Sequence, residues 1–281
     1  MPDVPEMQKT INLVVSESTT LGQFLSGLAP EDWERDSACA EWQVGDVIAH
    51  LTQGAIGWAA ALNRAVQGDY GPPPGQRPLQ PGERGSETTA QAAIETRQAT
   101  ATGDMLSSFV AGYEKLEQQM RELRAEDWEK PCYHRRGVIP VHAYVTRRIQ
   151  ELSIHGWDVR SAFDLDYELS QDATPLLMGV THRWLHTTFA PLEGVPTPVR
   201  FRFEISDPAS LREDVVIGSN GFEIESAGGS SPDVTFRCNG SSYILLVFGR
   251  LRADGGAAPG RISVAGDRNL AAKFSQWFQG V

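Results

Sequence analysis

Apolar residues in the first 165 positions of the chain recur at three- and four-residue steps, which is the spacing of an amphipathic helix. Prolines, glycines and irregular polar stretches separate these segments. The predicted helices are Ile11–Leu28, a second one that opens at Trp42–Asp46 and carries Val47, Ile48, Leu51 and Ile56, a long stretch Glu87–Leu123 with a break near Thr102–Gly103, and Pro140–Phe163. The N-terminal half is therefore expected to be helical.

After Phe163 the pattern changes, because apolar and polar residues begin to alternate as they do in a half-buried strand. Turn signals such as Ser219-Asn220-Gly221 separate the segments. The predicted elements are a helix over Ser170–Phe189, strands over Val199–Ser206, Val215–Ile217, Gly221–Glu225, Asp233–Arg237 and Arg261–Val264, a strand-like apolar run over Ser242–Gly249, and a closing amphipathic helix with Leu270, Phe274, Trp277 and Phe278. This order predicts an α+β second domain.

The segment Pro140–Phe163 combines a helical apolar stripe with two polar residues of chemical interest. We expect Pro140 at the first helical position, where proline is favoured. Glu151 and His155 are four residues apart, so their side chains project from one face about one turn from each other. Such a pair can chelate one divalent ion, although the same spacing also serves a surface hydrogen bond. An open metal site needs roughly three protein ligands, so the third would come from elsewhere.

An internal repeat indicates how the helices are arranged. The stretch Leu28-Ala-Pro-Glu-Asp-Trp-Glu-Arg35 resembles Leu123-Arg-Ala-Glu-Asp-Trp-Glu-Lys130, and each copy joins two predicted helices. Two similar helical hairpins predict a four-helix bundle with internal pseudo-symmetry, in which side chains from facing helices converge on the axis. His50, on the second helix, could meet Glu151 and His155 there, or it could be a half-buried structural histidine.

The stretch Gly68–Ser86 is rich in proline and glycine, which exclude a helix and a central strand. It is predicted to be a long loop between helices. Two interpretations remain open for it, a mobile surface loop and a lid that contacts the substrate.

Length and composition favour a two-domain globular protein. The 281 residues exceed the usual size of one domain, and the change of pattern places the domains at residues 1–168 and 169–281. No run of about 18 apolar residues indicates a transmembrane helix, and the N-terminus lacks the features of a signal peptide. Cys39, Cys132 and Cys238 form no Cys-x-x-Cys pair, so we expect free thiols and a reducing, cytoplasmic environment.

The charge of the chain argues against some classes of partner. The formal net charge is −11, and the residues up to position 170 hold 25 acidic and 15 basic side chains. No basic stripe is present for a nucleic acid. An anionic substrate would have to be bound by a few local arginines against the overall field.

Two motifs carry a family resemblance, Trp42-x-Val44-x-Asp46-Val-Ile-Ala-His50-Leu51 and Glu151-Leu-x-x-His155-x-Trp-Asp158. Together they resemble the DinB-like superfamily, and more closely its mycothiol-dependent maleylpyruvate isomerase branch. The rest resembles the C-terminal domain of that branch, which is similar to sterol carrier proteins, through Asp233-Val-Thr-Phe-Arg237 and Val247-Phe-Gly-Arg250. The resemblance implies an N-terminal DinB-like four-helix bundle followed by a smaller sterol-carrier-like α+β domain.

The same resemblance implies a metal on His50, Glu151 and His155, with mycothiol as the thiol co-substrate. Two imidazoles and one carboxylate leave positions open on Zn²⁺, as in catalytic zinc sites. Nickel, iron or manganese at these residues would also be consistent. A metal-bound thiol loses its proton readily and becomes a nucleophile.

We therefore expect a metal-dependent enzyme that activates a low-molecular-weight thiol for S-transfer or thiol exchange on an electrophilic small molecule. The alternatives are a thiol-dependent cis-trans isomerase and a non-catalytic protein that binds a small apolar ligand. In the isomerase branch the second domain closes over the metal, so the resemblance implies that Arg250 holds an anionic substrate, with Arg261 or Arg136 as substitutes. The protein is expected to be a monomer or a homodimer, without a nucleic-acid or membrane partner.

Several polar neighbours keep two interpretations. Asp46 and Asp158 could each orient a nearby imidazole ring, or could instead interact favourably with the helix dipole. The basic segment His134–Arg136 could meet a carboxylate or be solvated. The other histidines, His142, His182 and His186, are expected to be structural or exposed. All three cysteines are expected to be dispensable, although Cys132, with basic residues near it in sequence, comes closest to a reactive one.

Overall fold

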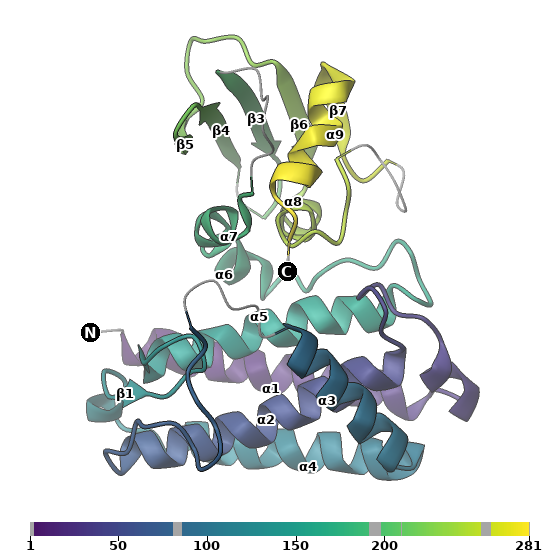
Figure 1. Cartoon of the computed structure of the whole chain (residues 1–281), viewed down its shortest axis with the longest axis vertical. Coiled ribbons are helices and arrows are strands. Elements are labelled where there is room, and N and C mark those ends of the chain that lie inside the picture. Colours follow the sequence, from purple (N-terminus) through teal and green to yellow (C-terminus); the bar gives the residue numbers. More distant parts are fainter. Residues whose placement is uncertain (1–2, 81–85, 191–197, 209, 254–259, 281) are drawn as a thin grey trace. The chain divides into compact units, whose positions relative to one another are not determined.

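The computed structural model describes residues 3–80, 86–190, 198–208, 210–253 and 260–280. Its contacts divide the chain into two compact units, Met1–Asp164 and Leu165–Val281 (Figure 1). The first, the N-terminal unit, is helical, and the second, the C-terminal unit, combines helices with a five-stranded sheet. This confirms the predicted fold class. The extent of each functional domain, with a boundary at residue 168, stays a prediction.

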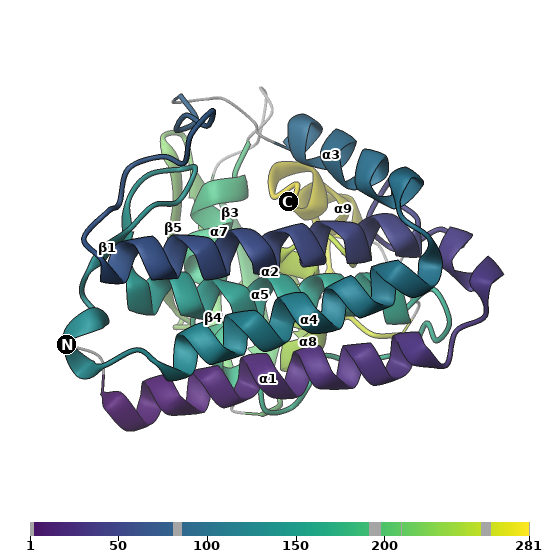
Figure 2. The same ribbon diagram turned by 90° about the horizontal axis from the view of Figure 1, so that it is seen from below.

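The N-terminal unit is organised around four long helices, which Figure 2 shows from one side. The helix α2 packs against α4 and α5, and α1 packs against the same two helices, so the four enclose a common core. A shorter helix, α3, lies against α2. The bounds are α1 Val4–Ser26, α2 Val44–Val66, α3 Ser86–Ala99, α4 Thr102–Arg121 and α5 Val141–Arg160. The long predicted segment Glu87–Leu123 is thus two helices, separated just before the expected break.

The sequence repeat forms the same local structure twice. Its copies are short 3₁₀ helices, η1 Pro30–Glu34 and η2 Ala125–Asp127, which follow α1 and α4. In each copy the aspartate, Asp32 or Asp127, accepts a hydrogen bond from the backbone N–H three residues earlier, at 3.0 and 2.8 Å. The tryptophan after each aspartate is buried. Both helical hairpins therefore use one capped turn to lead the chain towards α2 or α5.

The start of α5 differs from the prediction. Pro140 has an extended conformation, with φ −67° and ψ 151°, and precedes the helix instead of occupying its first turn. It belongs to β2, Ile139–Pro140, which pairs with β1, Pro131–Cys132, in a two-stranded ribbon. The φ that proline imposes suits an extended residue as well as a helical one, and pairing with β1 decides between them.

The described part of the loop Gly68–Ser86 is tied to this ribbon region, because Leu79 donates its backbone N–H to the carbonyl of Arg135 at 2.7 Å. Residues 81–85 lie outside the described residues. The choice between a surface loop and a lid therefore stays open. Across the part of the chain that is described, no helix has both the length and the low polarity needed to cross a membrane.

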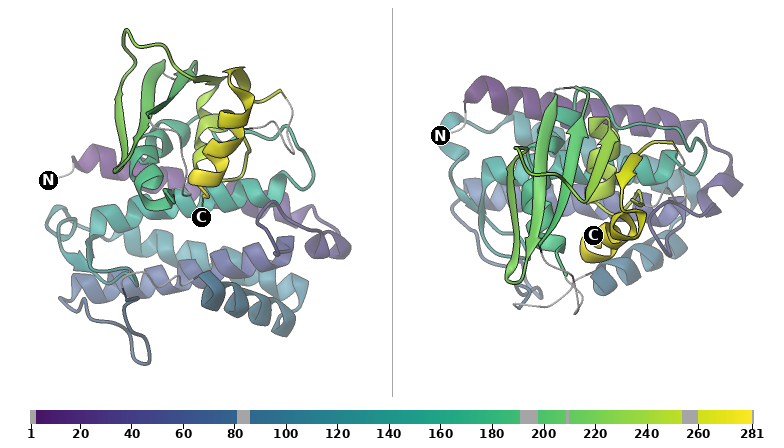
Figure 3. Two further views of the ribbon diagram at one scale, coloured as in Figure 1. Left: turned by 45° about the horizontal axis from the view of Figure 1, so that its top comes forward. Right: turned by 90° about the horizontal axis from the view of Figure 1, so that it is seen from above.

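The C-terminal unit has a mixed sheet with strand order β5-β4-β3-β6-β7 (Figure 3). The central pair β3 and β6 is parallel, and the other neighbours are antiparallel. The strands are β3 Val199–Ile205, β4 Leu211–Gly218, β5 Gly221–Ser226, β6 Val234–Cys238 and β7 Ser263–Gly266, and the helices are α6 Thr174–Met178, α7 Thr181–Thr188, α8 Gly240–Val247 and α9 Arg268–Trp277.

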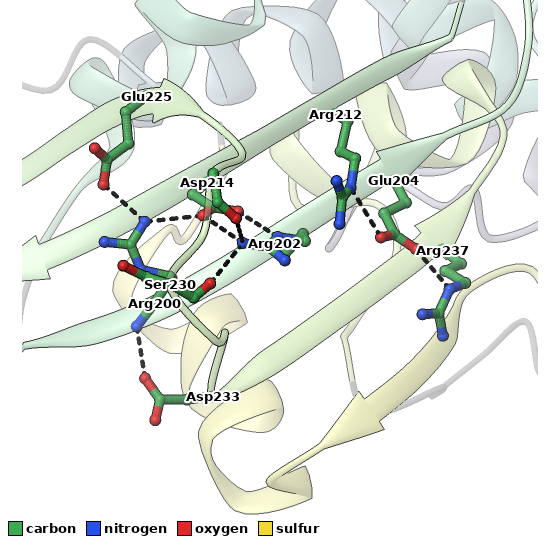
Figure 4. Close-up of polar contacts among 10 residues, drawn as sticks. Arg200, Arg202, Glu204, Arg212, Asp214, Glu225, Ser230, Asp233 and Arg237 are labelled. Atoms are coloured by element: carbon green, nitrogen blue, oxygen red, sulfur yellow. Dashed lines mark hydrogen bonds and ion pairs between the residues drawn. The ribbon is translucent and has the colours of Figure 1, made fainter.

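Alternation along β3 gives the sheet two different faces. On one face Phe201 and Phe203 contact the ring of Phe274 in α9, with ring centroids 5.3 Å apart in each pair. On the other face Arg202 makes a two-point contact with the buried carboxylate of Asp214, at 2.7 and 2.9 Å (Figure 4). The apolar face forms the core of the unit, and ion pairs cover the other face.

The predicted strand-like run Ser242–Gly249 is wrong, because these residues form most of the helix α8 and the turn after it. Every residue of α8 is buried, so the run shows neither a helical stripe nor strand alternation. The signal available in the sequence is Asn239, whose side chain accepts a hydrogen bond from the N–H of Ser242 and caps the helix. Arg250 therefore follows a helix and not a strand.

Candidate metal centre

The three predicted ligands lie together in the N-terminal unit. His50 comes from α2, and Glu151 and His155 come from one face of α5. The Oε2 atom of Glu151 is 3.2 Å from Nε2 of His50 and 3.8 Å from Nε2 of His155. The ligand atoms of all three residues lie within 4.8 Å of one another. Packing of α2 on α5 thus brings together residues 101 positions apart.

These residues fit a divalent cation by donor type and by spacing. Ligands at Zn–N and Zn–O distances of about 2.0–2.1 Å in a tetrahedral site are about 3.3 Å from one another. The two distances from Glu151 Oε2, 3.2 and 3.8 Å, are close to that value. Two imidazole nitrogens and one carboxylate oxygen are a donor set used by catalytic zinc sites, which keep a position open for substrate.

Asp158 fixes the orientation of His155. Its Oδ2 is 2.9 Å from Nδ1 of His155, and its side chain is fully buried. Because a carboxylate accepts a hydrogen bond, Nδ1 carries a proton, and Nε2 is the nitrogen that faces Glu151 and would bind a cation after losing its own proton. Asp46 has a different task, since its oxygens accept bonds from the Gln43 backbone N–H and from Arg97.

Burial and ion pairing set the charges of the three residues. Burial lowers the pKa of His50, and the bond to Glu151 only partly offsets this effect. Burial also disfavours charged His155, but hydrogen bonds with Asp158 and Cys39 raise its pKa to about 9. Burial alone would raise the pKa of Glu151, yet His50 and Arg148 hold it well below its usual range. The site therefore contains an ionised carboxylate, and a bound cation would displace a proton from His155.

Two neighbours of the site, Trp42 and Arg148, have no role assigned to them from the sequence, although Trp42 opens one of the two motifs. Trp42 is buried, and its ring lies 5.2 Å from that of His50 and 5.9 Å from that of His155, measured between centroids. Arg148 is 1% exposed, and its Nη2 is 3.8 Å from Glu151 Oε2. Its position three residues before Glu151 is the only local signal for it.

A pocket of about 420 Å³ opens beside Trp42. Polar side chains make up much of its lining, including Glu41, Gln43, Asp46 and Arg97. Trp42 is shared between this pocket and the two imidazole rings, but none of the three candidate ligands lines the pocket.

The cysteines are arranged differently from the expectation. Cys132 is fully buried, and burial raises its pKa to about 12, so it lacks the properties of a reactive thiol. Burial does the same for Cys238. Cys39 instead lies at the site, where its sulfur, His155 and Asp158 form a second group of atoms within 4.8 Å of one another. All three cysteines are free thiols.

The predicted arginines of the C-terminal unit bind backbone carbonyls. Nη1 of Arg250 donates to the carbonyl of Phe248 at 3.1 Å. Nη1 of Arg261 donates to the carbonyl of Tyr167 at 3.0 Å. A substrate role for Arg250 stays a proposal.

Three other histidines have local partners. His134 lies near the rings of Trp58 and Tyr144 and within 3.2 Å of Nη1 of Arg147. His182 pairs with Glu213 at 2.7 Å, a carboxylate that helical spacing could not reveal because it lies on β4. His186 stacks on Phe222.

Comparisons with known proteins agree with this architecture. The profile of the mycothiol maleylpyruvate isomerase N-terminal domain matches residues 14–160, and that of the SCP-2 sterol transfer family matches residues 181–279. The crystal structure of a mycothiol-dependent maleylpyruvate isomerase is similar with a TM-score of 0.65 at 14% identity, covering 94% of this chain and 93% of that one. The crystal structure of a variant of that isomerase with one histidine replaced is similar with a TM-score of 0.64 at 13% identity, with the same coverage of both chains. No curated protein sequence matched. At such identity the structural likeness establishes the fold alone.

Proposed function

Because the chain belongs to the mycothiol maleylpyruvate isomerase N-terminal domain family, we propose that it is a metal-dependent enzyme that activates a low-molecular-weight thiol, mycothiol, towards an electrophilic small molecule. The observation that carries the proposal is the convergence of His50, Glu151 and His155 from two helices. We further propose zinc as the ion and the reducing cytoplasm as the compartment, in keeping with three free thiols.

Some residues of the site would bind the ion, and others orient these ligands. When bound at the three ligands, a divalent ion supplies positive charge that favours the thiolate form of a thiol. Asp158 holds the proton of His155 on Nδ1, so that Nε2 is the nitrogen available to bind the ion. Trp42 covers both imidazole rings and restricts water around them.

An external thiol suits the site better than Cys132 or Cys238, because their burial raises their pKa to about 12. A free thiol in water is only a few per cent thiolate at neutral pH, so activation is needed. In S-transfer or exchange, the thiolate sulfur forms a bond to the electrophile and the leaving group departs with its electron pair. Arg250 is proposed to hold an anionic part of that electrophile.

Isomerisation is a second candidate, favoured by the similarity to solved mycothiol-dependent maleylpyruvate isomerase structures. Here the thiolate adds to one carbon of a conjugated double bond, rotation follows about the resulting single bond, and the thiolate leaves as the double bond reforms. Both reactions need the same activated thiol. They differ in whether the thiol is consumed.

A carrier of apolar ligands is less well supported. The rings of Phe201, Phe236 and Phe274 contact one another across the core of the C-terminal unit, with centroids 5.3–6.0 Å apart. Aromatic side chains thus fill the apolar face of the sheet. Retention of an apolar ligand without turnover would favour the carrier.

Elemental analysis and kinetics test the proposal together. Protein purified without a histidine tag should contain about one divalent ion per chain. Turnover of an electrophile should require both this ion and the thiol. The variant His50→Ala should lose the ion and the activity while keeping its helical circular dichroism, because the bundle core is formed by other residues. A metal-free wild-type protein with full activity would refute the proposal.

A further inference from the structure

Arg148 is buried, and its ion pair with Glu151 leaves two of its donor atoms without a hydrogen bond among the described residues. It lies three residues before Glu151 on α5, with 1% of its surface exposed. Among the described residues, its Nε and Nη2 atoms have no hydrogen-bond partner. The approach of Nη2 to Glu151 Oε2, 3.8 Å, is too long for a hydrogen bond. The guanidinium instead faces the rings of Trp58 and Tyr113, at 5.2 and 5.8 Å. A buried cation with unsatisfied donors is costly unless something polar binds it.

A second orphan group belongs to Tyr113, whose ring centroid is 5.8 Å from Cζ of Arg148. The hydroxyl of Tyr113, on α4, is buried and has no hydrogen-bond partner among the described residues. Burial raises the pKa of Tyr113 to about 12, with Glu151 adding to this effect and Arg148 opposing it. The hydroxyl therefore keeps its proton at neutral pH. Two helices thus present groups without hydrogen-bond partners near Glu151: the Arg148 guanidinium, which can only donate, and the Tyr113 hydroxyl, which can donate or accept.

Gly54 makes room for this guanidinium. A Cβ atom at position 54 would lie 2.6 Å from Nη1 of Arg148, which is closer than atoms can approach. Glycine inside a helix such as α2 destabilises it relative to alanine. The absence of a side chain at Gly54 therefore leaves space in α2 for the Arg148 guanidinium.

We infer that Arg148 and Tyr113 form an oxyanion-binding subsite beside the proposed metal centre, and that this subsite binds a carboxylate of the electrophile. Nε and Nη2 form one edge of the guanidinium, and this edge matches the two oxygens of a carboxylate. The Tyr113 hydroxyl adds a neutral donor. The identity of the ligand as the electrophile rests on the proposed function, whereas the preference for an anion rests on the donors themselves.

Calorimetric titration of zinc-loaded protein with maleate, in the absence of thiol, tests this inference. Maleate serves as a small dicarboxylate probe. Arg148→Gln should weaken maleate binding about tenfold or more, and Tyr113→Phe several-fold. Zinc content and helical circular dichroism should not change. Arg147→Gln is the matched control, because Arg147 is the next residue of α5 and contacts His134. It should bind maleate as the wild type does.

A second variant covers the case in which Arg148→Gln fails to fold. Gly54→Ala displaces the guanidinium while it keeps the charge and improves helix propensity. It should also weaken maleate binding without loss of zinc. Equal affinity in all variants, as expected if the donors bind only a buried water, overturns the subsite. A loss of maleate binding that follows a loss of zinc also overturns it, because Arg148 would then only support Glu151.

The two proposals can fail separately. If the wild type shows no thiol-dependent turnover but Arg148 still determines maleate affinity, the subsite stands and the proposed function is wrong. If turnover needs metal and thiol, but maleate affinity is unchanged in Arg148→Gln and Tyr113→Phe, the proposed function stands and the subsite is wrong.

Discussion

Asp158 sets the tautomer of His155, and it is the residue behind the candidate ligands whose role is clearest. Its Oδ2 is 2.9 Å from His155 Nδ1, and its side chain has no exposed surface. Replacing such a hydrogen-bonding carboxylate behind a metal ligand costs about 10- to 100-fold in metal affinity. We expect Asp158→Asn to weaken zinc binding by this factor, as measured by competition with a chromophoric chelator. An unchanged zinc affinity in a folded variant would contradict the assignment.

Cys39 is the one cysteine that the fold places at the site, yet we expect it to be dispensable. The thiol that reacts should be the external one, since the three ligands already account for the metal. Cys39→Ser should therefore keep most of the thiol-dependent turnover, and omission of the small thiol should abolish it. Loss of turnover in Cys39→Ser, with zinc content unchanged, would show that the nucleophile belongs to the protein.

Arg250 carries a prediction about the charge of the electrophile. If its guanidinium binds a carboxylate or phosphate, Arg250→Ala should cost roughly 1.5–3 kcal/mol in transition-state binding, about ten- to a hundredfold or somewhat more in kcat/KM. Zinc content should stay the same. Arg237→Ala is a suitable control, because Arg237 is an exposed residue that pairs with Glu204. Equal kinetics in both variants would move the role to Arg261 or Arg136, or remove it.

Spacing in the sequence predicts some residues of the site and not others. Glu151 and His155 follow from local helix geometry, and the family resemblance adds His50. The position of Cys39 at the site cannot be predicted from spacing, because it depends on the path of the segment before α2. In that segment the Ala38 N–H donates to the carbonyl of Asp158 at 3.0 Å. Arg148 looks like a surface arginine in the sequence, and only the packing of α5 against α2, with the Tyr113 ring of α4 close by, buries it.

At the scale of elements, the segment between β1 and α5 makes stability depend on pH. Burial lowers the pKa of His134 to about 4, and Arg147 adds to this effect. In the unfolded chain the value is about 6.5, so the unfolded state binds more protons between these pH values. The free energy of unfolding should therefore fall as the pH decreases through this range, by on the order of 1 kcal/mol at pH 5.

Urea unfolding at pH 7 and pH 5 measures this effect. His134→Gln removes the titrating group, so the variant should lose less stability than the wild type between the two pH values. Equal losses would show that His134 is solvated in the folded protein.

Elements were predictable where burial is one-sided. The helices α1, α2 and α4 each keep an exposed side, and apolar residues alternate with polar ones along β3, so the apolar residues of these elements keep a clear period. The helix α8 is buried on all sides, so its Ile244–Val247 run carries no period, and it was interpreted as strand-like. The start of α5 was missed by one residue because pairing with β1 is a tertiary effect.

At the scale of the whole molecule, two units of different architecture follow one another in the chain. The repeat of capped turns in the first unit places α2 and α5 in equivalent positions, and these two helices carry all three candidate ligands. The sequence contains this repeat in plain form, so the bundle and its ligand helices were predictable together. Substrate identity was not, because it depends on orphan donors that only packing reveals.

The central claim is that His50, Glu151 and His155 would hold a divalent ion, and that an external thiol would bind to this ion as its thiolate. Titration of cobalt-substituted protein with mycothiol, followed by absorption spectroscopy, tests it most directly. The account predicts a sulfur-to-cobalt charge-transfer band that saturates with thiol, appears at a pH well below the pKa of the free thiol, and is absent in His50→Ala. A cobalt protein that turns over the electrophile at saturating thiol without such a band would contradict it.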